Sequence, residues 1–400
     1  MQSPSRPSFV FRKSLAVTTL LLATTVAATF LSWAPMIYAA EQKDVPSSLS
    51  QTAPASAPNA MPISPYSARF GRSQPVVAII GENRGTELTD FVIPYGVISR
   101  SGAAAVVTVS TQPGLLNMKP ALRIQPQATI AEFDARFPDG ADYVIVPAVT
   151  NSADKTLIAW VAAQGAKGGT IVSICDGALV VANSGLMKGH RATAHWATEE
   201  HRRMMYPDTQ WENNVRYVAD GRIVSSAGIS AAIPTSLALV EAIAGHDRAA
   251  ELAKELGVSN WSAAHNSDTF QPKFGVNLLA HATRFTNAWF HSNESIGVPV
   301  TLGIDDIALA LTVDAYSRTS RSHVFVLATS IEPVQTRNGL MFMPDRIIGS
   351  TNPPDYVLPN FDSTPSAQVF DKVLVAIGDR YGRSTAYRVA LDFEYPDFKK

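Results

Sequence analysis

The stretch TIVSICDGALVVANSGLMKGHRATAHW, residues 170–196, decides the fold of this chain. It begins with an apolar, β-branched run that ends at Cys175, the only cysteine in the sequence. Small and apolar residues typical of a helix follow at once, at 177–183. A strand that turns through a glycine directly into a helix is typical of a nucleophile elbow, which holds a reactive side chain on a strained corner. The pattern therefore predicts that Cys175 lies at the carboxyl end of a strand.

Cys175 is predicted to carry a reactive thiol. A helix N-terminus lowers the pKa of a thiol and offers backbone N–H groups to an anion. His195, twenty residues later, is a candidate acid or base. Asp176 acts in the opposite sense, since a neighbouring carboxylate raises the pKa of a thiol. Its side chain has two other options, which are to cap the helix or to serve as the acid itself.

Apolar strands and helices alternate around this stretch. Continuous apolar runs indicate strands that are buried on both faces of a sheet. The predicted elements are strands at 76–80, 103–110 and 142–149, and helices at 88–101 and 155–164. Alternation of this kind predicts an α/β fold with a doubly wound parallel sheet and right-handed crossovers. Sites in such sheets lie at the carboxyl ends of the strands, so Asp90, Val149 and Cys175 are expected in one cleft.

Three separate pieces of the sequence resemble the ThiJ/PfpI superfamily, which includes deglycase-like members. The segment GLMKGHRATAHW at 185–196 is similar to the one that follows the Cys-x-Gly elbow in that family. Asp90 stands four positions before Pro94, as an acidic residue does there, and 221–243 resembles the closing strand, turn and last helix. The resemblance covers residues 75–245 and is nearest to the isonitrile-hydratase-like and AraC-regulator-like branch. It implies a flavodoxin-like, class I glutamine amidotransferase-like fold.

The resemblance also implies roles for single residues. Cys175 would be the nucleophile of a cofactor-independent enzyme, and Asp90 would move the proton, with Glu87 as the fallback. His195 is either catalytic or packed against Trp196. The backbone around the turn and the elbow would hold the developing anion and the substrate, at Ala148, Val149, Asp176 and Gly177. The expected reaction is that of a hydratase or lyase on an electrophilic carbon, or of a hydrolase on a reactive carbonyl.

Two departures from the family pattern leave an alternative open. Asp176 stands where the branch commonly has a small hydroxyl residue, and Pro147-Ala148-Val149 stands where the superfamily tends to have Pro-Gly-Gly. The added side chains crowd the cleft. The alternative is a non-catalytic ligand-binding or redox-sensing module, related to the AraC-type regulator domain. It would lack a DNA-binding region, since no pair of basic helices follows residue 245.

Composition limits the partners. The chain has 33 Lys and Arg against 34 Asp and Glu, with no basic block, so it lacks the electrostatic pattern of a nucleic-acid-binding protein. No Cys-x-x-Cys or His-Glu-x-x-His motif indicates a metal. No Gly-x-Gly-x-x-Gly follows a strand, and no P-loop lysine is present, so no nucleotide cofactor is expected. The expected partner is a small-molecule substrate or ligand.

The N-terminus has the pattern of an export signal. Arg6, Arg12 and Lys13 precede an uncharged, largely apolar stretch at 14–40. This predicts a signal peptide or an uncleaved signal anchor at 1–40. The chain is then periplasmic or membrane-anchored, facing outside the cytoplasm, and it contacts the membrane only through this segment. Residues 41–74, rich in Ser, Pro, Ala and Gln, are predicted to be a disordered linker.

The C-terminal part resembles a partial copy of the first. Residues 297–348 track 72–130 at a nearly constant offset, with Ser317-Arg318 in the place of Ser99-Arg100. The predicted organisation is a ThiJ/PfpI-like domain at 75–250, a connecting helical segment at 251–296 and a second α/β lobe at 297–400. Ala308 takes the place of Asp90 and no second cysteine elbow follows, so this lobe is expected to be non-catalytic. Its tail is predicted to end in strands.

The second copy also affects the expected oligomeric state. Superfamily members usually use the corresponding surface between identical subunits. A covalent second half-copy would occupy it within one chain. A monomer or a different dimer is therefore expected.

Overall fold

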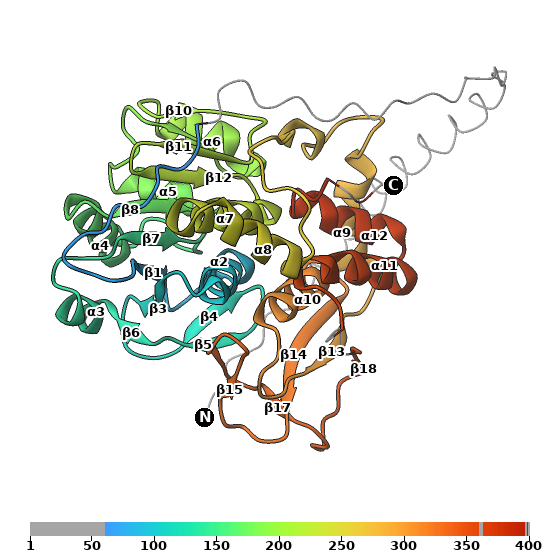
Figure 1. The fold of residues 1–400 in the computed structure, drawn as a ribbon. Helices are drawn as coiled ribbons and strands as arrows, with labels where there is room; N and C mark the ends of the chain where they lie inside the picture. The colour runs from blue at the N-terminus through green and yellow to red at the C-terminus, as the bar shows by residue number, and fades with distance from the viewer. Residues whose placement is uncertain (1–60, 360–362, 397, 399–400) are drawn as a thin grey trace, which may run out of the picture. The chain divides into compact units, whose positions relative to one another are not determined.

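The computed structural model describes residues 61–359, 363–396 and 398, and a seven-stranded sheet lies at the centre of the first lobe, residues 61–256 (Figure 1). Its strands, in order across the sheet, are β11 (Tyr217–Asp220), β12 (Ile223–Ser226), β8 (Thr170–Ser173), β7 (Tyr143–Val146), β1 (Val76–Gly81), β3 (Ala105–Ser110) and β6 (Ala128–Thr129). All neighbours are parallel except β11 and β12. The predicted α/β fold with a mostly parallel sheet is confirmed.

Alternate residues of β1 belong to two hydrophobic cores, because side chains of a strand point to opposite faces in turn. The core on one face contains helices α2 (Leu88–Ser101), α7 (Ala232–Ala244) and α8 (His246–Leu256). The core on the other face contains α3 (Ile130–Arg136), α4 (Lys155–Ala166) and α5 (Gly177–Asn183). Helices on both faces explain why the strands are apolar throughout rather than alternating.

Shorter elements complete the first lobe. They are β2 (Thr86–Glu87), β4 (Leu116–Lys119), β5 (Arg123–Gln125), β9 (Arg191–Ala192), β10 (Gln210–Trp211), α6 (Glu199–Met205) and the 3-10 turns η1 (Trp196–Thr198) and η2 (Ile229–Ala231). The connection to the second lobe contains the turn η3 (Ser267–Thr269) and helix α9 (Leu278–Phe290).

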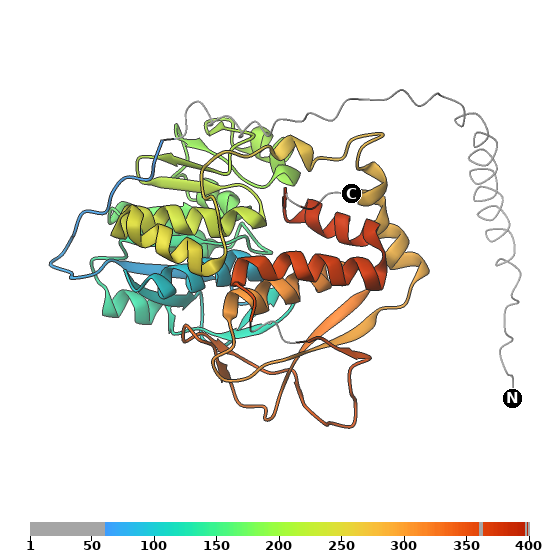
Figure 2. The same cartoon turned by 45° about the vertical axis from the view of Figure 1, so that its right-hand side comes forward.

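The second lobe, residues 294–398, is built around a four-stranded sheet (Figure 2). Its strands are, in order, β17 (Arg346–Ile347), β14 (Ser322–Ala328), β13 (Glu294–Pro299) and β18 (Tyr356–Val357), all parallel. Helix α10 (Asp306–Ser317) connects β13 to β14, as α2 connects β1 to β3. The order β17-β14-β13-β18 matches the order β6-β3-β1-β7, so the two sheets share their strand arrangement.

The duplication reaches further than the sequence predicted. Asp355-Tyr356-Val357 at β18 repeats Asp142-Tyr143-Val144 at β7. The last helices, α11 (Val369–Tyr381) and α12 (Arg383–Asp392), follow the turn η4 (Ser366–Gln368) and meet at a glycine, as α7 and α8 do after η2. Gly382 has φ 91° and Gly245 has φ 88°.

The predicted strand-like tail is therefore wrong. Its apolar residues recur every three or four positions, at Val369, Phe370, Val373, Leu374 and Ile377, and form the buried face of α11. Among the described residues of the second lobe, nothing corresponds to β8 and the elbow helix α5.

A small mixed sheet joins the two lobes. Strands β15 (Val334–Gln335) and β16 (Met341–Phe342) form an antiparallel pair in the second lobe. β16 also pairs with β5 of the first lobe, and the sheet has the order β15-β16-β5-β4-β2. Backbone hydrogen bonds thus connect the two copies.

Helices α2 and α10 pack against each other and exchange two ion pairs. The Arg100 side chain at the end of α2 donates to Asp305, 2.9 Å away, which caps the start of α10. Arg318 at the end of α10 donates to Glu87, which caps the start of α2. Arg100 and Arg318 occupy equivalent positions in the two copies, as do Glu87 and Asp305. The helices therefore run antiparallel, with each N-cap carboxylate paired to an arginine of the other helix.

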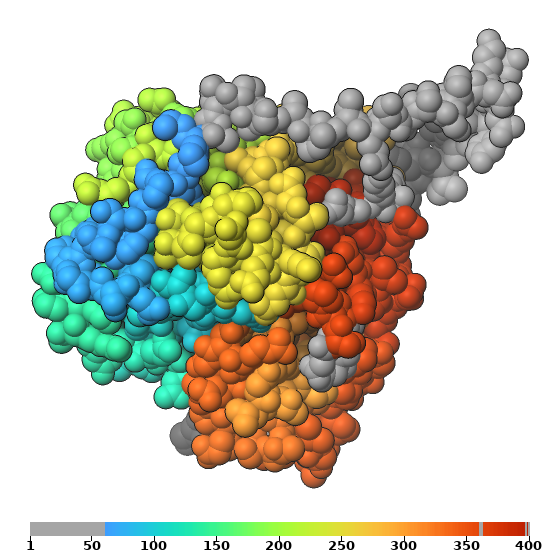
Figure 3. Space-filling model, viewed as in Figure 1, coloured from blue at the N-terminus to red at the C-terminus, as the bar shows by residue number. Residues whose placement is uncertain are grey.

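The segment at 61–74 packs on the first lobe rather than continuing the predicted linker (Figure 3). Ile63 is buried, the Tyr66 N–H donates to the Ala242 carbonyl at 2.8 Å, and Arg72 pairs with Asp142 at 2.8 Å. The predicted export segment and the linker up to residue 60 lie outside the described residues. No helix in the described part of the chain is long and apolar enough to cross a membrane.

Arg100 should contribute much more to stability than Arg337, although both contact Asp305. The Arg100 side chain is 7% exposed and that of Arg337 is 52% exposed. Removing one partner of a buried pair leaves an uncompensated charge, so Arg100→Ala is expected to lower the free energy of unfolding by about 3 kcal/mol. Arg337→Ala should lower it by less than about 1 kcal/mol. Urea unfolding measures both, and equal effects would contradict the prediction.

Candidate active site

Cys175 lies on a strained corner directly after β8. Its φ of 55° is in the left-handed region, which is unusual for a residue with a side chain. The Ile174 N–H donates to the Val146 carbonyl of the neighbouring strand at 3.0 Å, and helix α5 begins at Gly177. Strain of this kind is characteristic of functional sites. The structure thus has the elbow geometry that the sequence predicted.

Gly177 is required by a close approach of two backbones. A Cβ at this position would lie 1.9 Å from the Val146 carbonyl oxygen. The Gly177 N–H closes the elbow by donating to the Ile174 carbonyl at 2.9 Å. Since that N–H is already used, Gly177 shapes the elbow. It does not offer a hydrogen bond to an anion, which is the role that the sequence predicted for it.

Asp90, in the first turn of α2, is fully buried. Its Oδ2 accepts the Ala148 N–H at 3.1 Å, whereas Oδ1 has no hydrogen-bond partner. Burial raises the pKa of Asp90 to about 8, against the lowering effect of the Ala148 N–H and of Arg318. Asp90 is therefore mostly protonated at neutral pH and can act as a hydrogen donor.

Cys175 does not have the low thiol pKa that its helix N-terminus suggested. Burial raises the pKa of the thiol, and the charges of Asp90, Asp176 and Glu87 raise it further. A hydrogen bond from the Asp176 N–H acts in the opposite sense. The expected effect of Asp176 on the thiol is thus present. Burial and three carboxylates outweigh the helix N-terminus.

The Asp176 side chain turns away from its own helix. It makes no capping hydrogen bond to α5 and accepts the Thr198 hydroxyl at 2.6 Å instead. Burial raises its pKa, and the hydrogen bond from Thr198 and the charge of Arg202 lower it. Of the options that the sequence left open, capping does not occur.

Both ring nitrogens of His195 are engaged. Nδ1 accepts the Ala197 N–H at 3.1 Å, so Nε2 carries the proton and donates to the Asp392 carbonyl at 3.0 Å. Asp392 belongs to the end of α12, so this histidine fastens the second lobe to the loop after the elbow. The geometry favours a structural role over the predicted catalytic one.

The turn at 147–149 is tied to the start of α2. The Ala148 N–H is taken by Asp90, and the Ala148 carbonyl accepts the Glu87 N–H at 2.8 Å. Val149 forms an isolated bridge with Thr86. Ala148 therefore positions Asp90 rather than offering its N–H to an anion. The Asp176 N–H is the predicted anion-binding group that faces the thiol.

The second lobe contributes charged residues that the sequence motifs around Cys175 did not indicate. Arg318 and Asp314 of α10 pair with each other and contact Glu87 and Thr89 at the start of α2. Glu394, fully buried at φ 53°, accepts His265 Nε2 at 2.8 Å and the Trp196 N–H at 3.0 Å. The repeated Ser-Arg pair at 317–318 was the sequence signal for Arg318.

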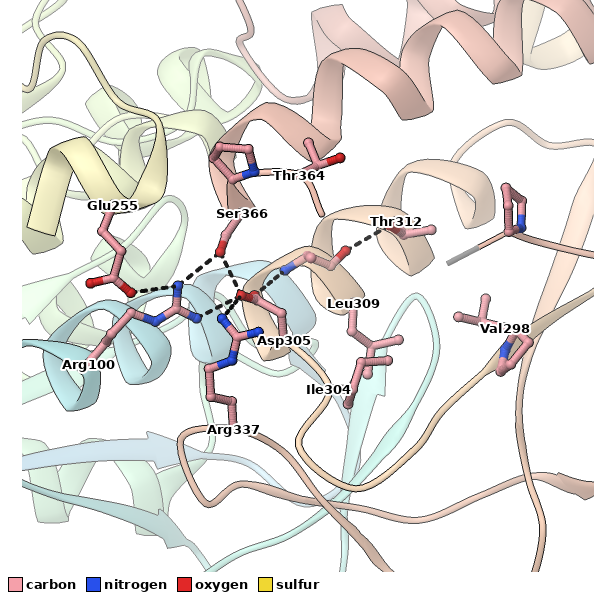
Figure 4. A pocket seen from close by; sticks show the side chains of 14 residues that line it. Arg100, Glu255, Val298, Ile304, Asp305, Leu309, Thr312, Arg337, Thr364 and Ser366 are labelled. Carbon is pink, nitrogen blue, oxygen red and sulfur yellow. Dashed lines mark hydrogen bonds and ion pairs between the residues drawn. The ribbon is translucent and has the colours of Figure 1, made fainter. Parts of the chain in front are cut away.

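A cavity lies at the corresponding place of the second lobe (Figure 4). Arg100 and Arg337 converge there on Asp305, together with Ser366, and Ala308 stands in the place of Asp90. The cavity measures about 100 Å³. Its lining contains no cysteine. No cluster of His, Cys, Asp and Glu in the described ranges has the arrangement of a metal site.

Residues 76–242 match the DJ-1/PfpI family. Over 96 residues the chain is 31% identical to isonitrile hydratase of Pseudomonas putida, covering 24% of this chain and 41% of that protein. Over 180 residues it is 23% identical to protein dj-1beta of Drosophila melanogaster, covering 44% and 93%. The first lobe is a DJ-1/PfpI family domain.

Two solved structures also match part of this chain. The crystal structure of Drosophila melanogaster DJ-1beta is 22% identical, with a TM-score of 0.43, and covers 47% of this chain and 100% of its own. An AraC family transcriptional regulator from Pseudomonas putida is 16% identical, with a TM-score of 0.40, and covers 46% and 99%.

Gly177→Ala should destabilise the protein because the added methyl group meets the backbone of β7. Overpacking costs 1–3 kcal/mol in typical cores, and about 3 kcal/mol is expected against a rigid carbonyl. Gly378→Ala in α11 is the matched control, since the nearest atom to its Cβ lies 3.7 Å away. That variant should be neutral or slightly more stable. The midpoints and slopes of urea unfolding measure both effects.

Asp90 should reduce the stability of the protein by a margin that grows with pH. An unfolded aspartate ionises near pH 3.9, whereas folded Asp90 keeps its proton up to about pH 8. Between these limits the folded state holds one more proton, so stability falls as pH rises. Asp90→Asn should therefore be more stable than the wild type, with a gain that grows by up to about 1.4 kcal/mol per pH unit.

The measurement is urea unfolding at several pH values within that window. Asp139→Asn, at an exposed position, is the control and should change stability by a constant amount. A pH-independent difference for Asp90→Asn would show that Asp90 ionises normally in the folded state.

Proposed function

We propose that this protein is a cysteine-dependent enzyme that acts on a small electrophilic molecule, as a hydratase or lyase or as a hydrolase of a reactive carbonyl. The observation that carries the proposal is the pairing of Cys175 on a strained elbow with a buried, mostly protonated Asp90. Asp90 Oδ1 has no partner within the protein. A carboxyl group with one free oxygen beside a nucleophile is suited to move a proton to or from a reacting molecule.

The thiol and the carboxyl act as a coupled pair. The reactive form is the one in which the thiol has lost its proton and Asp90 is neutral, and the raised thiol pKa makes it less abundant than the form with a neutral thiol and an ionised Asp90. Sulfur forms a bond to the electrophilic carbon, and the Asp90 proton passes to the atom that gains the electron pair. Asp90 is then ionised and ready to take a proton from water in the second half of the reaction. The Asp176 N–H stabilises the sulfur anion.

Hydration of an isonitrile fits this scheme. The relative named isonitrile hydratase is 31% identical to this chain over 96 residues. Water adds across the terminal carbon of R–N≡C to give the formamide R–NH–CHO, with no redox change. A reactive carbonyl would instead give a hemithioacetal at the same sulfur. The neutral Asp90 would protonate the alkoxide in that case.

A second candidate is a ligand-binding or redox-sensing module. The raised thiol pKa and the 6% exposure of Cys175 favour the ligand-binding form of this candidate, since both slow the attack of the sulfur on a substrate and on a peroxide alike. Oxidation by a peroxide would convert the thiol to a sulfenic acid and release water. Such a protein would keep its function without turnover.

We also propose that the protein acts outside the cytoplasm, as a monomer or as a dimer different from that of its relatives. The charge and apolar pattern at 6–40 supports export. The packing of α10 on α2 supports the proposed oligomeric state, because the surface of α2 is covered within the chain.

Replacing Asp90 with Asn should separate thiol reactivity from catalysis. The variant lacks a negative charge that raises the pKa of Cys175, so iodoacetamide should alkylate the thiol at lower pH than in the wild type. Turnover of a small isonitrile or 1,2-dicarbonyl should nonetheless fall by about 100-fold or more, because the proton donor is lost. Asp139→Asn should change neither quantity.

Two further measurements distinguish the candidate functions. Full turnover in Cys175→Ser would exclude the cysteine mechanism. Absence of turnover on every electrophile, together with ligand binding or peroxide oxidation at Cys175, would support the sensing module.

A further inference from the structure

Helix α9 and the turn before it carry a patch of exposed apolar side chains. Its members are at least two-fifths exposed, and Phe274, Leu279 and Trp289 are 92%, 80% and 76% exposed. The patch, called the α9 patch, consists of Phe274, Val276, Leu278, Leu279, Phe285, Trp289 and Phe290. Clustered exposed apolar side chains of this kind mark a surface that binds another protein, a ligand or a membrane.

The opposite side of α9 is fixed to the protein. Asn287 is buried and donates to the Thr319 carbonyl at 2.8 Å and to the Thr385 hydroxyl at 3.0 Å. His281 Nε2 lies 3.0 Å from the Phe270 carbonyl, and Ala280 is buried in a small core with Leu391 of α12. The helix is thus held on the second lobe through its buried residues, and the side chains of the α9 patch are exposed.

The charged residues within the segment that carries the patch are all positive. Residues 271–293 include the exposed Lys273 and Arg284 but no Asp or Glu. A helix with aromatic and aliphatic residues on one side and cations beside them is typical of one that lies in a membrane interface. Trp289 is of the type that prefers the headgroup region. Two copies of the patch facing each other would bring these cations together, which disfavours self-association.

We propose that the α9 patch binds the surface of an anionic lipid bilayer. Its apolar side chains enter the headgroup–acyl boundary, and Lys273 and Arg284 contact lipid phosphates. The apolar stretch at 14–40 in the sequence would bring the domain to a bilayer when retained. The contact through α9 is separate from that segment, and it would fix the orientation of the two lobes on the membrane.

The test uses the full chain with vesicles of phosphatidylcholine, alone or mixed equally with phosphatidylglycerol, containing brominated acyl chains. Bromine quenches only tryptophan that is within the bilayer boundary. The signal of Trp289 is the quenching lost in Trp289→Phe. We expect Trp289-dependent quenching on the mixed vesicles and much less on phosphatidylcholine alone. Because the N-terminal segment can bind vesicles by itself, this local quenching, not total binding, is the readout.

Three variants sharpen the test. Leu279→Asp/Phe290→Asp should abolish the Trp289-dependent quenching, and Lys273→Gln/Arg284→Gln should weaken it on mixed vesicles by roughly tenfold or more in lipid concentration. Leu302→Asp/Val375→Asp changes two exposed apolar residues outside the patch and should have no effect.

Two outcomes would overturn the proposal. One is vesicle-bound protein with no Trp289-dependent quenching. The other is a dimer in solution that Leu279→Asp/Phe290→Asp dissociates while quenching stays absent, which would assign the patch to a second copy. Activity at Cys175 does not enter either outcome, so failure here leaves the proposed function unaffected.

Discussion

The reciprocal pairing of α2 and α10 is the interaction on which the rest of the structure depends. Each helix begins with a carboxylate that caps its first turn, and each ends near an arginine that reaches the cap of the other. Carboxylates favour helix N-termini and arginines favour C-termini, so the two pairs add to both helix dipoles. A second reciprocal contact reinforces the arrangement, with Gly228 against Glu394 and Gly257 against Pro365. The lobes are thus joined through equivalent residues on both sides.

This pairing also sets the electrostatics of the candidate site. Arg318 reaches the region of Glu87 and Asp90 from the second lobe, and it lowers the pKa of Asp90 against the effect of burial. Glu87 and Asp314 compete for the same arginine, and burial, then Asp314 and Asp90, raise the pKa of Glu87. One cation among several buried carboxylates cannot keep all of them ionised. The site therefore holds protons near the thiol at neutral pH, which suits proton transfer and reduces stability.

The sequence predicted the parts of the fold that local pattern controls. Continuous apolar runs predicted the strands of the sheet, and the glycine after Cys175 predicted the elbow. The spacing of Asp90 to Pro94 singled out Asp90 as the candidate acid. The repeat at 297–348 predicted a second α/β lobe, and the structure has a four-stranded parallel sheet there. The tail was mispredicted because VLVAIG suits a strand by composition, while its place beside α10 makes it a helix. The engagement of His195 with Asp392 depends on tertiary contacts across the whole chain, which no local pattern contains.

Covalent duplication explains how the two copies became different. In a symmetric dimer every substitution appears in both subunits, so a site cannot be lost on one side alone. Here Asp90 and Ala308 occupy equivalent positions, and one copy keeps the nucleophile strand while the other lacks it among its described residues. What both copies retain is the N-cap carboxylate and the arginine that reaches it. This shared interface connects the two copies, and through it Arg318 of the second copy supplies positive charge beside Glu87 and Asp90.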